Sequence, residues 1–270
     1  MMLGLIVLSM TAGLIGSLFG LGGGVIVVPV LTILYDMPAH DAIAISLVAI
    51  VAISAAGSAT LVKERVANVR LGLRMEMGAA AGAVIGAVIA LYLNSSLLSL
   101  AFAFVMIYSA VYMLMRPEKK VSDDDLSESD GVFVYHDPRT GEDIRYRVRN
   151  QRTGMLGFFA AGITSPLSGV GGGAIKVPIM NIHMNVPMKV ATATSSFVIG
   201  ITAFTGAAVY FLSGVLDVQT AAVVIVGAFV GSRMGVAILP KIDTASLRRY
   251  FSVVLIFLAA VMFLKAGGLL

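Results

Sequence analysis

Two glycine-rich pentapeptides have the residue types and the spacing for binding chemistry. They are Gly-Leu-Gly-Gly-Gly at Gly20–Gly24 and Gly-Val-Gly-Gly-Gly at Gly169–Gly173, and a short apolar segment follows each. A helix that begins at such a cluster presents unpaired backbone N–H groups and the positive end of its dipole. Glycine lets an anion approach those groups, so the clusters predict a shared anion site. The residues expected to bind the anion are Gly22, Gly23, Gly24, Gly171, Gly172 and Gly173. The alternative is that the glycines only allow two hairpins to pack tightly.

Lys176 and three hydroxyl residues are candidate side chains for the same anion. Lys176 lies one helical turn after Gly173 in an apolar segment, where a charge is costly and usually functional. It could supply a positive charge, or it could snorkel to the surface or pair with a carboxylate. Ser46 and Ser195 are hydroxyls at matched positions of a repeat described below, and Thr194 precedes Ser195. Their hydroxyls could donate to anion oxygens, or they could bond one helix to another.

Two further charges lie in apolar segments. Glu76 is near the start of its segment and could pair locally with Arg74. Proton coupling through Glu76 is a weaker alternative. Arg233 lies near the end of its segment, where snorkelling accounts for it.

Residue types argue against several soluble chemistries. A dinucleotide-binding fingerprint would need glycine at Val25 or Ala174, and a P-loop would need Ser or Thr directly after Lys176. The chain has no cysteine, and its three histidines share no metal-ligand spacing. We therefore expect no catalytic residues, no metal, no cofactor and no ATP site, and hence a protein that is not an enzyme.

The composition is that of a membrane protein. Hydrophobic residues make up 58% of the 270 residues and charged residues only 13%, with a mean hydropathy of +0.95. A soluble domain is about a quarter charged. The net charge of +4 does not indicate a nucleic-acid partner, because the basic residues lie in short loops between apolar runs. Such residues set membrane topology.

The chain contains a long internal repeat. Gly13–Met115 aligns with Gly162–Leu264 without a gap, at a constant offset of 149 residues. The glycine clusters, Pro29 and Pro178, and the two serines fall on matched positions. Repeats of this length in an apolar chain are typical of secondary transporters, whose substrate sites form where the halves meet.

The loop charges predict that the second copy is inverted in the membrane. Loop 63–74 carries four Lys or Arg residues, whereas its matched loop 212–220 carries none. Loop 240–249 carries three, whereas its matched loop 93–97 is uncharged. Basic loops lie on the cytoplasmic side, so matched loops lie on opposite faces. Both termini are then expected outside.

We expect ten apolar segments, of which four form two hairpins. The second segment of each copy has only 11 residues, too few to cross a hydrocarbon core about 30 Å thick. Each pair of first segments should therefore form a hairpin, with the glycine tips facing each other near the midplane. The predicted segments are 3–19, 25–35, 42–62, 72–93, 97–115, 154–168, 174–184, 190–211, 219–239 and 247–264.

The chain divides into a membrane repeat at 1–115, a hydrophilic cytoplasmic linker at 116–153 and a second membrane repeat at 154–270. Alternation over Phe133–His136 and Ile144–Val148 predicts a β-hairpin in the linker. The linker is either a solvated connection or a regulatory and partner-docking element.

The doubled motif resembles a known family. Gly-x-Gly-Gly-Gly-x-x-x-Val-Pro at Gly20–Pro29 and again at Gly169–Pro178 is similar to the sulfite exporter TauE/SafE family, also called toluene sulfonate uptake permeases. The resemblance implies an integral membrane permease that moves sulfur-containing anions such as sulfite or organosulfonates.

The sequence thus predicts an all-α polytopic membrane protein of two inverted repeats, in the cell membrane. Its expected function is export of a small sulfur-containing anion by alternating access, with the bilayer and possible homodimer contacts as its other partners. The alternatives are an uptake permease or symporter for the same anions, and a non-transport sensor that acts through the linker.

Overall fold

The computed structural model describes most of the chain. It describes residues 2–115, 132–137, 141–239, 249–250, 252–253, 256–257, 259–261 and 263–264. The acidic middle of the linker and parts of the last predicted segment, 247–264, lie outside the described residues.

Helices form where the sequence predicts apolar segments. The first half contains α1 (Met2–Phe19), α2 (Gly24–Leu34), α3 (Ala39–Lys63), α4 (Val69–Tyr92) and α5 (Ser95–Met115). The second half contains α6 (Gln151–Ser168), α7 (Gly173–Pro178), α8 (Met188–Leu212) and α9 (Val218–Ile238). A π-helical turn, Ile179–His183, directly extends α7. Within the described chain, five helices are long and apolar enough to cross a membrane, namely α1, α3, α4, α8 and α9.

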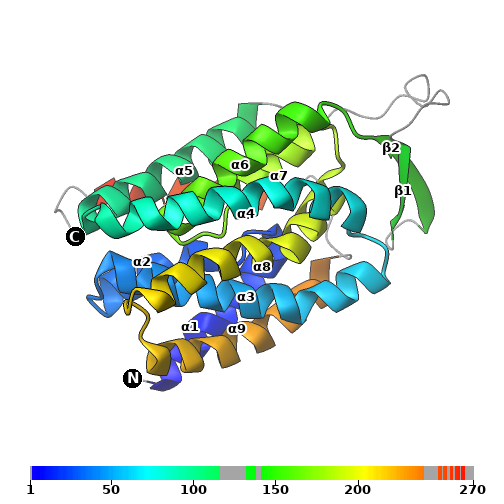
Figure 1. The fold of residues 1–270 in the computed structure, drawn as a ribbon. Helices are drawn as coiled ribbons and strands as arrows, with labels where there is room; N and C mark the ends of the chain where they lie inside the picture. Colours follow the sequence, from blue (N-terminus) through cyan, green and yellow to red (C-terminus); the bar gives the residue numbers. More distant parts are fainter. Residues whose placement is uncertain are drawn as a thin grey trace.

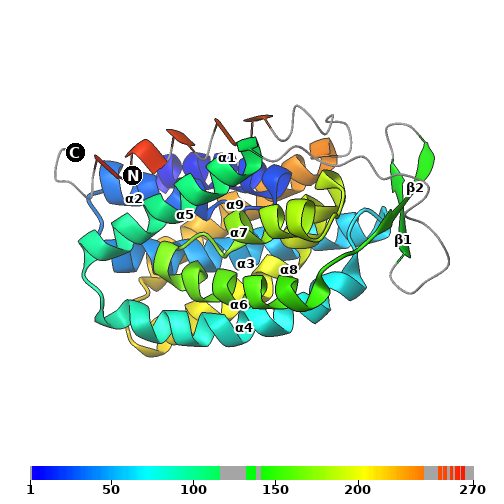
Figure 2. The ribbon, with the colours of Figure 1, turned by 90° about the horizontal axis from the view of Figure 1, so that it is seen from above.

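The two halves interlock. The first helix of each half packs against the fourth helix of the other half, so α1 lies along α9 and α6 lies along α4. Helices α3 and α8 pack against each other between these two pairs (Figures 1 and 2). The short helices α2 and α7 pack against α3 and α8 respectively. The halves therefore share one interior rather than forming two separate domains.

Small residues set the distance between the paired helices. Gly82 on α4 faces the backbone of α6, where an added Cβ would collide with the Phe159 carbonyl oxygen. Gly231 on α9 faces α1 in the same way, at the Met10 carbonyl oxygen. Both the glycines and the carbonyls they meet are 149 residues apart. The glycine ladders thus pack within the chain, by the close approach that small residues permit.

The linker contains a two-stranded antiparallel sheet. Strand β1 (Val132–Asp137) pairs with β2 (Glu142–Arg147), with Phe133 opposite Tyr146. The rings of these two residues stack at a centroid distance of 5.9 Å, and Tyr146 is buried. The hairpin lies at one end of the helix bundle (Figures 1 and 2).

Candidate functional site

The glycine clusters turn the chain from one helix into the next. Gly22 and Gly23 have φ values of 76° and 77°, and Gly171 and Gly172 have values of 72° and 79°. These left-handed conformations cost little for glycine and are strained for other residues. They end the preceding helix and start the next at Gly24 or Gly173. Local sequence therefore determines two tight, glycine-tipped hairpins.

In the part of the chain that the structure describes, the starts of α2 and α7 leave amide groups without a backbone acceptor. Among the backbone hydrogen bonds of the described residues, those of α2 begin with Ile26 and Val27, which donate to the Gly23 carbonyl at 3.0 and 3.1 Å. Those of α7 begin with Ile175 and Lys176, which donate to the Gly172 carbonyl. The amides just before these residues are buried and donate to no backbone acceptor in that set. Buried N–H groups of this kind are what an anion would satisfy.

The two tips touch each other. A Cβ on Gly24 would collide with the Gly169 carbonyl oxygen, and a Cβ on Gly173 would collide with the Gly20 carbonyl oxygen. Gly24 and Gly173 are matched positions of the repeat, as are Gly20 and Gly169. All four residues are buried. The structure therefore brings the predicted glycines together, in a closed arrangement with no room for a ligand between these backbones.

Ser46 and Ser195 bond to the tips. The Ser46 Oγ donates to the Gly169 carbonyl at 2.6 Å, and the Ser195 Oγ donates to the Gly20 carbonyl at 2.8 Å. Each serine thus connects α3 or α8 to the tip of the other half. In this closed arrangement their protons are used within the protein.

A buried hydroxyl without a partner lies in the second hairpin. Ser165, on α6, has no exposed surface, and its Oγ makes no hydrogen bond in the described part of the chain. Its carbonyl accepts from the Gly169 amide at 2.8 Å, at the base of the tip. An unsatisfied buried hydroxyl costs about 1–3 kcal/mol. A ligand that accepts a hydrogen bond near this tip could satisfy it.

Thr194 lies away from the tip contacts. Its Oγ1 accepts from the Asn68 amide at 2.9 Å, in the loop before α4. The Asn68 side chain donates in turn to the Tyr146 hydroxyl of the linker hairpin at 2.7 Å. Thr194 therefore connects α8 to the linker hairpin through Asn68.

Lys176 is paired with Glu76 in the interior. The Lys176 Nζ lies 2.8 and 3.0 Å from the two Glu76 carboxylate oxygens and donates to the Thr202 hydroxyl at 2.6 Å. Thr202 completes the network by donating its amide to Glu76 at 3.0 Å and its hydroxyl to the same carboxylate oxygen. Lys176 has no exposed surface and Glu76 is 2% exposed. The Phe158 ring centroid lies 5.7 Å from the Lys176 Nζ.

This network identifies the partners of Lys176 and Glu76, two of the charges that the sequence places in apolar segments. Lys176 pairs with a carboxylate, which was one of the two alternatives to substrate binding. The sequence suggested that Glu76 could pair with Arg74, but the Glu76 carboxylate binds Lys176 instead. Arg74 donates to Gln151 at 3.0 Å. One signal for the pair was available in the sequence, since each residue is a charge inside an apolar segment. No such signal pointed to Thr202.

Lys176 also lies against the second tip. A Cβ on Gly172 would be 3.5 Å from the Lys176 Cε, so the lysine side chain runs back along the glycine turn. Helical side chains point toward the helix N-terminus, which explains this direction. The ammonium group is therefore held by Glu76 while its stem lies beside the unpaired amides.

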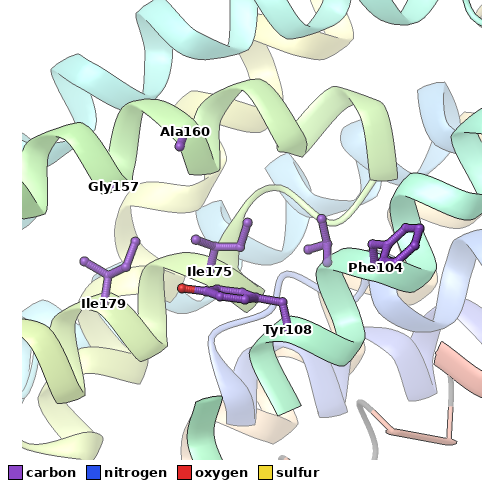
Figure 3. Close-up of a pocket in the computed structure, with 7 residues that line it drawn as sticks. Phe104, Tyr108, Gly157, Ala160, Ile175 and Ile179 are labelled. Carbon is purple, nitrogen blue, oxygen red and sulfur yellow. The ribbon is translucent and has the colours of Figure 1, made fainter. Parts of the chain in front are cut away.

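One cavity opens beside α7. It has a volume of about 400 Å³ and is lined by Phe104, Val105, Tyr108, Gly157, Ala160, Ile175 and Ile179, from α5, α6 and α7 with its π-helical extension (Figure 3). The lining carries no charged side chain. It suits apolar groups better than an anion, so the candidate anion site remains at the tips. Across the described residues, no cluster of three His, Cys, Asp or Glu side chains could hold a metal ion.

Within the part of the chain that the structure describes, five apolar helices and two buried glycine-tipped hairpins define an α-helical, multi-pass membrane protein. The chain belongs to the sulfite exporter TauE/SafE family, whose model matches residues 5–262. This confirms the resemblance of the doubled glycine motif, and it supports a membrane transporter as the class of function.

Curated relatives carry transporter names. The chain is 30% identical over 259 residues to the probable membrane transporter protein YunE of Bacillus subtilis, with 93% of each chain covered. It is 24% identical over 267 residues to a probable membrane transporter protein of Methanocaldococcus jannaschii, covering 93% of this chain and 91% of that one. It is 26% identical over 234 residues to the probable membrane transporter protein YdhB of Bacillus subtilis, covering 85% and 88%. No solved structure matches the chain.

Proposed function

We propose that this protein is a secondary transporter that exports a small sulfur-containing anion, sulfite or an organosulfonate. The anion would bind where the two glycine tips meet. Family membership supports the transporter class and the class of substrate. The observation that carries the site is that each helix start, Gly24 or Gly173, lies against the first glycine of the other cluster. Among the described residues, both helix starts have buried amides that donate to no backbone acceptor.

The proposal includes an inverted two-fold relation between the halves. Contacts that recur at an offset of 149 residues support it, such as the two serine-to-carbonyl bonds at the tips. The opposite charge of matched loops supports an inversion rather than a parallel repeat. The linker would then lie in the cytoplasm and both termini outside.

Alternating access would work by parting the tips. When one half rocks against the other, the tip contacts open and the bonds of Ser46 and Ser195 to the tip carbonyls break. The freed hydroxyls and the tip amides can then donate to the anion. In the closed arrangement described above, the backbones of the tips lie too close to admit the anion. Rocking around a fixed central site is the common mechanism of inverted-repeat transporters.

The purified protein in liposomes tests this function. Efflux would be measured for sulfite, thiosulfate, sulfoacetate, sulfate and chloride, in vesicles of known orientation, against protein-free vesicles. We expect selective flux of sulfur-containing anions from the cytoplasmic side. Selective flux in the opposite direction would identify an uptake permease. Absence of flux with every anion would contradict transport and favour a sensor.

A further inference from the structure

We propose that Glu76 and Lys176 couple anion movement to a proton. The inference rests on the proposed function and adds its coupling ion. Protonation of Glu76 would release Lys176 to pair with the anion at the second glycine tip. Proton and anion would then cross the membrane together, in the same direction.

The network contains the groups that this exchange needs. In the described chain, the hydrogen bonds and ion pairs of the Glu76 carboxylate go only to Lys176 and Thr202. Helix α6, which packs along α4, presents the Phe158 ring to the lysine rather than another charge. The carboxylate is thus the one counterion that Lys176 has in this set of contacts. Neutralising it leaves a buried ammonium that needs a new anion.

The other half of the protein provides an internal comparison. The positions that match Lys176, Glu76 and Thr202 are Val27, Ile225 and Ile53. Val27 and Ile53 are buried in one apolar cluster that also contains residues of α9. The matched site therefore packs the same arrangement of helices with aliphatic side chains, so the fold does not require charged residues at these positions.

The second site of the repeat contains the charged pair Glu76 and Lys176, whereas the matched site contains aliphatic residues. This difference indicates that the pair has a function rather than a role in packing. Removing two ions from water is expensive, and replacing a buried ion pair with apolar residues is often neutral or stabilising. An ionisable residue inside a membrane segment is functional by default. The structure is consistent with this interpretation, because the pair lies beside the candidate anion site.

The geometry allows Lys176 to change partners without a change of fold. Its stem already lies along the glycine turn at Gly172, and only the end of a flexible side chain must move. The amide groups at the start of α7 and the unpartnered Ser165 hydroxyl lie in the same hairpin. Released from Glu76, the ammonium group could join them around one anion.

The exchange balances in charge. One proton bonds to a Glu76 carboxylate oxygen and removes one negative charge, and a monovalent anion brings one back. Lys176 keeps its proton throughout. The loaded and empty sites therefore have the same net charge, so transport of a monovalent anion would be electroneutral and insensitive to membrane potential.

A monovalent sulfonate is the right probe. Methanesulfonate stays ionised at neutral pH, so it cannot carry the proton itself, whereas sulfite could. Proton movement would be followed with a pH-sensitive dye inside proteoliposomes, together with sulfonate flux. We expect one proton for each sulfonate in the wild-type protein, and no effect of an imposed potential. Apparent affinity should rise by up to tenfold for each pH unit lowered, as one linked proton requires.

Two variants separate coupling from folding. Glu76→Gln imitates the protonated carboxyl, so sulfonate flux should persist without protons and become driven by the membrane potential. The triple variant Glu76→Ile, Lys176→Val, Thr202→Ile copies the other half, and should fold but lose both proton coupling and sulfonate affinity. Arg74→Gln is the matched control, because it removes an exposed charge from the same helix. It should keep one proton for each sulfonate.

The outcomes are distinguishable. Sulfonate flux without protons in the wild-type protein, or unchanged proton coupling in Glu76→Gln, would overturn the coupling and leave the transporter standing. If only sulfite moves, an equal proton count per sulfite in wild type and Glu76→Gln would overturn it as well. Absence of flux with all anions would refute the proposed function itself.

Discussion

At the scale of single residues, Ser46 and Ser195 hold the closed tips together from opposite halves. Both are fully buried, and each bonds a carbonyl oxygen of the other half's glycine cluster. The two bonds are equivalent under the repeat. They contribute to the stability of the closed state and must break when the tips part.

Ser46→Ala and Ser195→Ala should therefore have similar effects. Each removes one buried hydrogen bond and leaves a carbonyl without a donor, so we expect a loss of about 1 kcal/mol each. Thermal unfolding in detergent measures this. Thr205→Ala is the control, because its bond to the Ile201 carbonyl is local and exposed. If only one serine mattered, the equivalence of the two tips would be contradicted.

At the scale of elements, two helix pairs depend on glycine at their contact. Gly82 lies against the backbone of α6 and Gly231 against the backbone of α1. A backbone oxygen cannot move aside as a flexible side chain can. These positions fix how closely the halves interlock.

Gly82→Ala and Gly231→Ala should each force the paired helices apart. Overpacking of this kind costs about 1–3 kcal/mol, and it should lower the unfolding temperature in detergent. Gly78→Ala is the milder control on the same ladder, since its Cβ would lie 3.2 Å from the Met155 carbonyl oxygen. A larger loss for Gly78→Ala than for Gly82→Ala would contradict the packing described here.

The linker hairpin is the second element with a specific contact. Burial raises the pKa of the Tyr146 hydroxyl to about 12, although the bond from Asn68 opposes the shift. A tyrosine in an unfolded chain has a pKa of about 10. The docked hairpin therefore holds the proton more tightly. The contribution of Tyr146 to docking is fully present below about pH 10 and is lost as the pH rises through about 12.

Tyr146→Phe should loosen the hairpin while keeping the ring stacking. The Asn68 side chain loses its acceptor, at a cost of about 1 kcal/mol, and Asn68 also bonds Thr194. Hydrogen exchange of residues 132–137 and 141–147 should become faster. Alkaline undocking should lose its Tyr146 component in this variant. Unchanged exchange would show that the hydroxyl contact does not hold the hairpin.

At the scale of the whole molecule, the proposed inversion places matched loops on opposite faces. Glu64 and Ser213 are matched positions, each directly after a central helix, α3 or α8. The chain has no cysteine of its own, so single labels are unambiguous. These two positions therefore test the topology without a background.

Glu64→Cys and Ser213→Cys should react with a membrane-impermeant thiol reagent from opposite sides. In right-side-out vesicles only the cysteine at position 213 should be labelled, and in inverted vesicles only the one at 64. The cysteine-free parent is the control. Labelling of both positions from one side would rule out the inverted arrangement.

Hydropathy, segment length and the glycine clusters predicted the membrane helices and the glycine hairpins. These features are local: a run of apolar residues is long enough to cross a bilayer or it is not, and glycine permits a left-handed turn wherever it occurs. The alternation that predicted a hairpin in the linker is local as well, and β1 and β2 lie there.

Only the tertiary structure decided the partners of the buried polar groups. Lys176 meets a carboxylate 100 residues away, and Ser195 meets a carbonyl 175 residues away. Nothing in the neighbouring sequence specifies such partners, because they follow from how the two halves interlock. A buried charge or hydroxyl must be satisfied by whatever the packing brings within about 3 Å, and packing is a property of the whole chain.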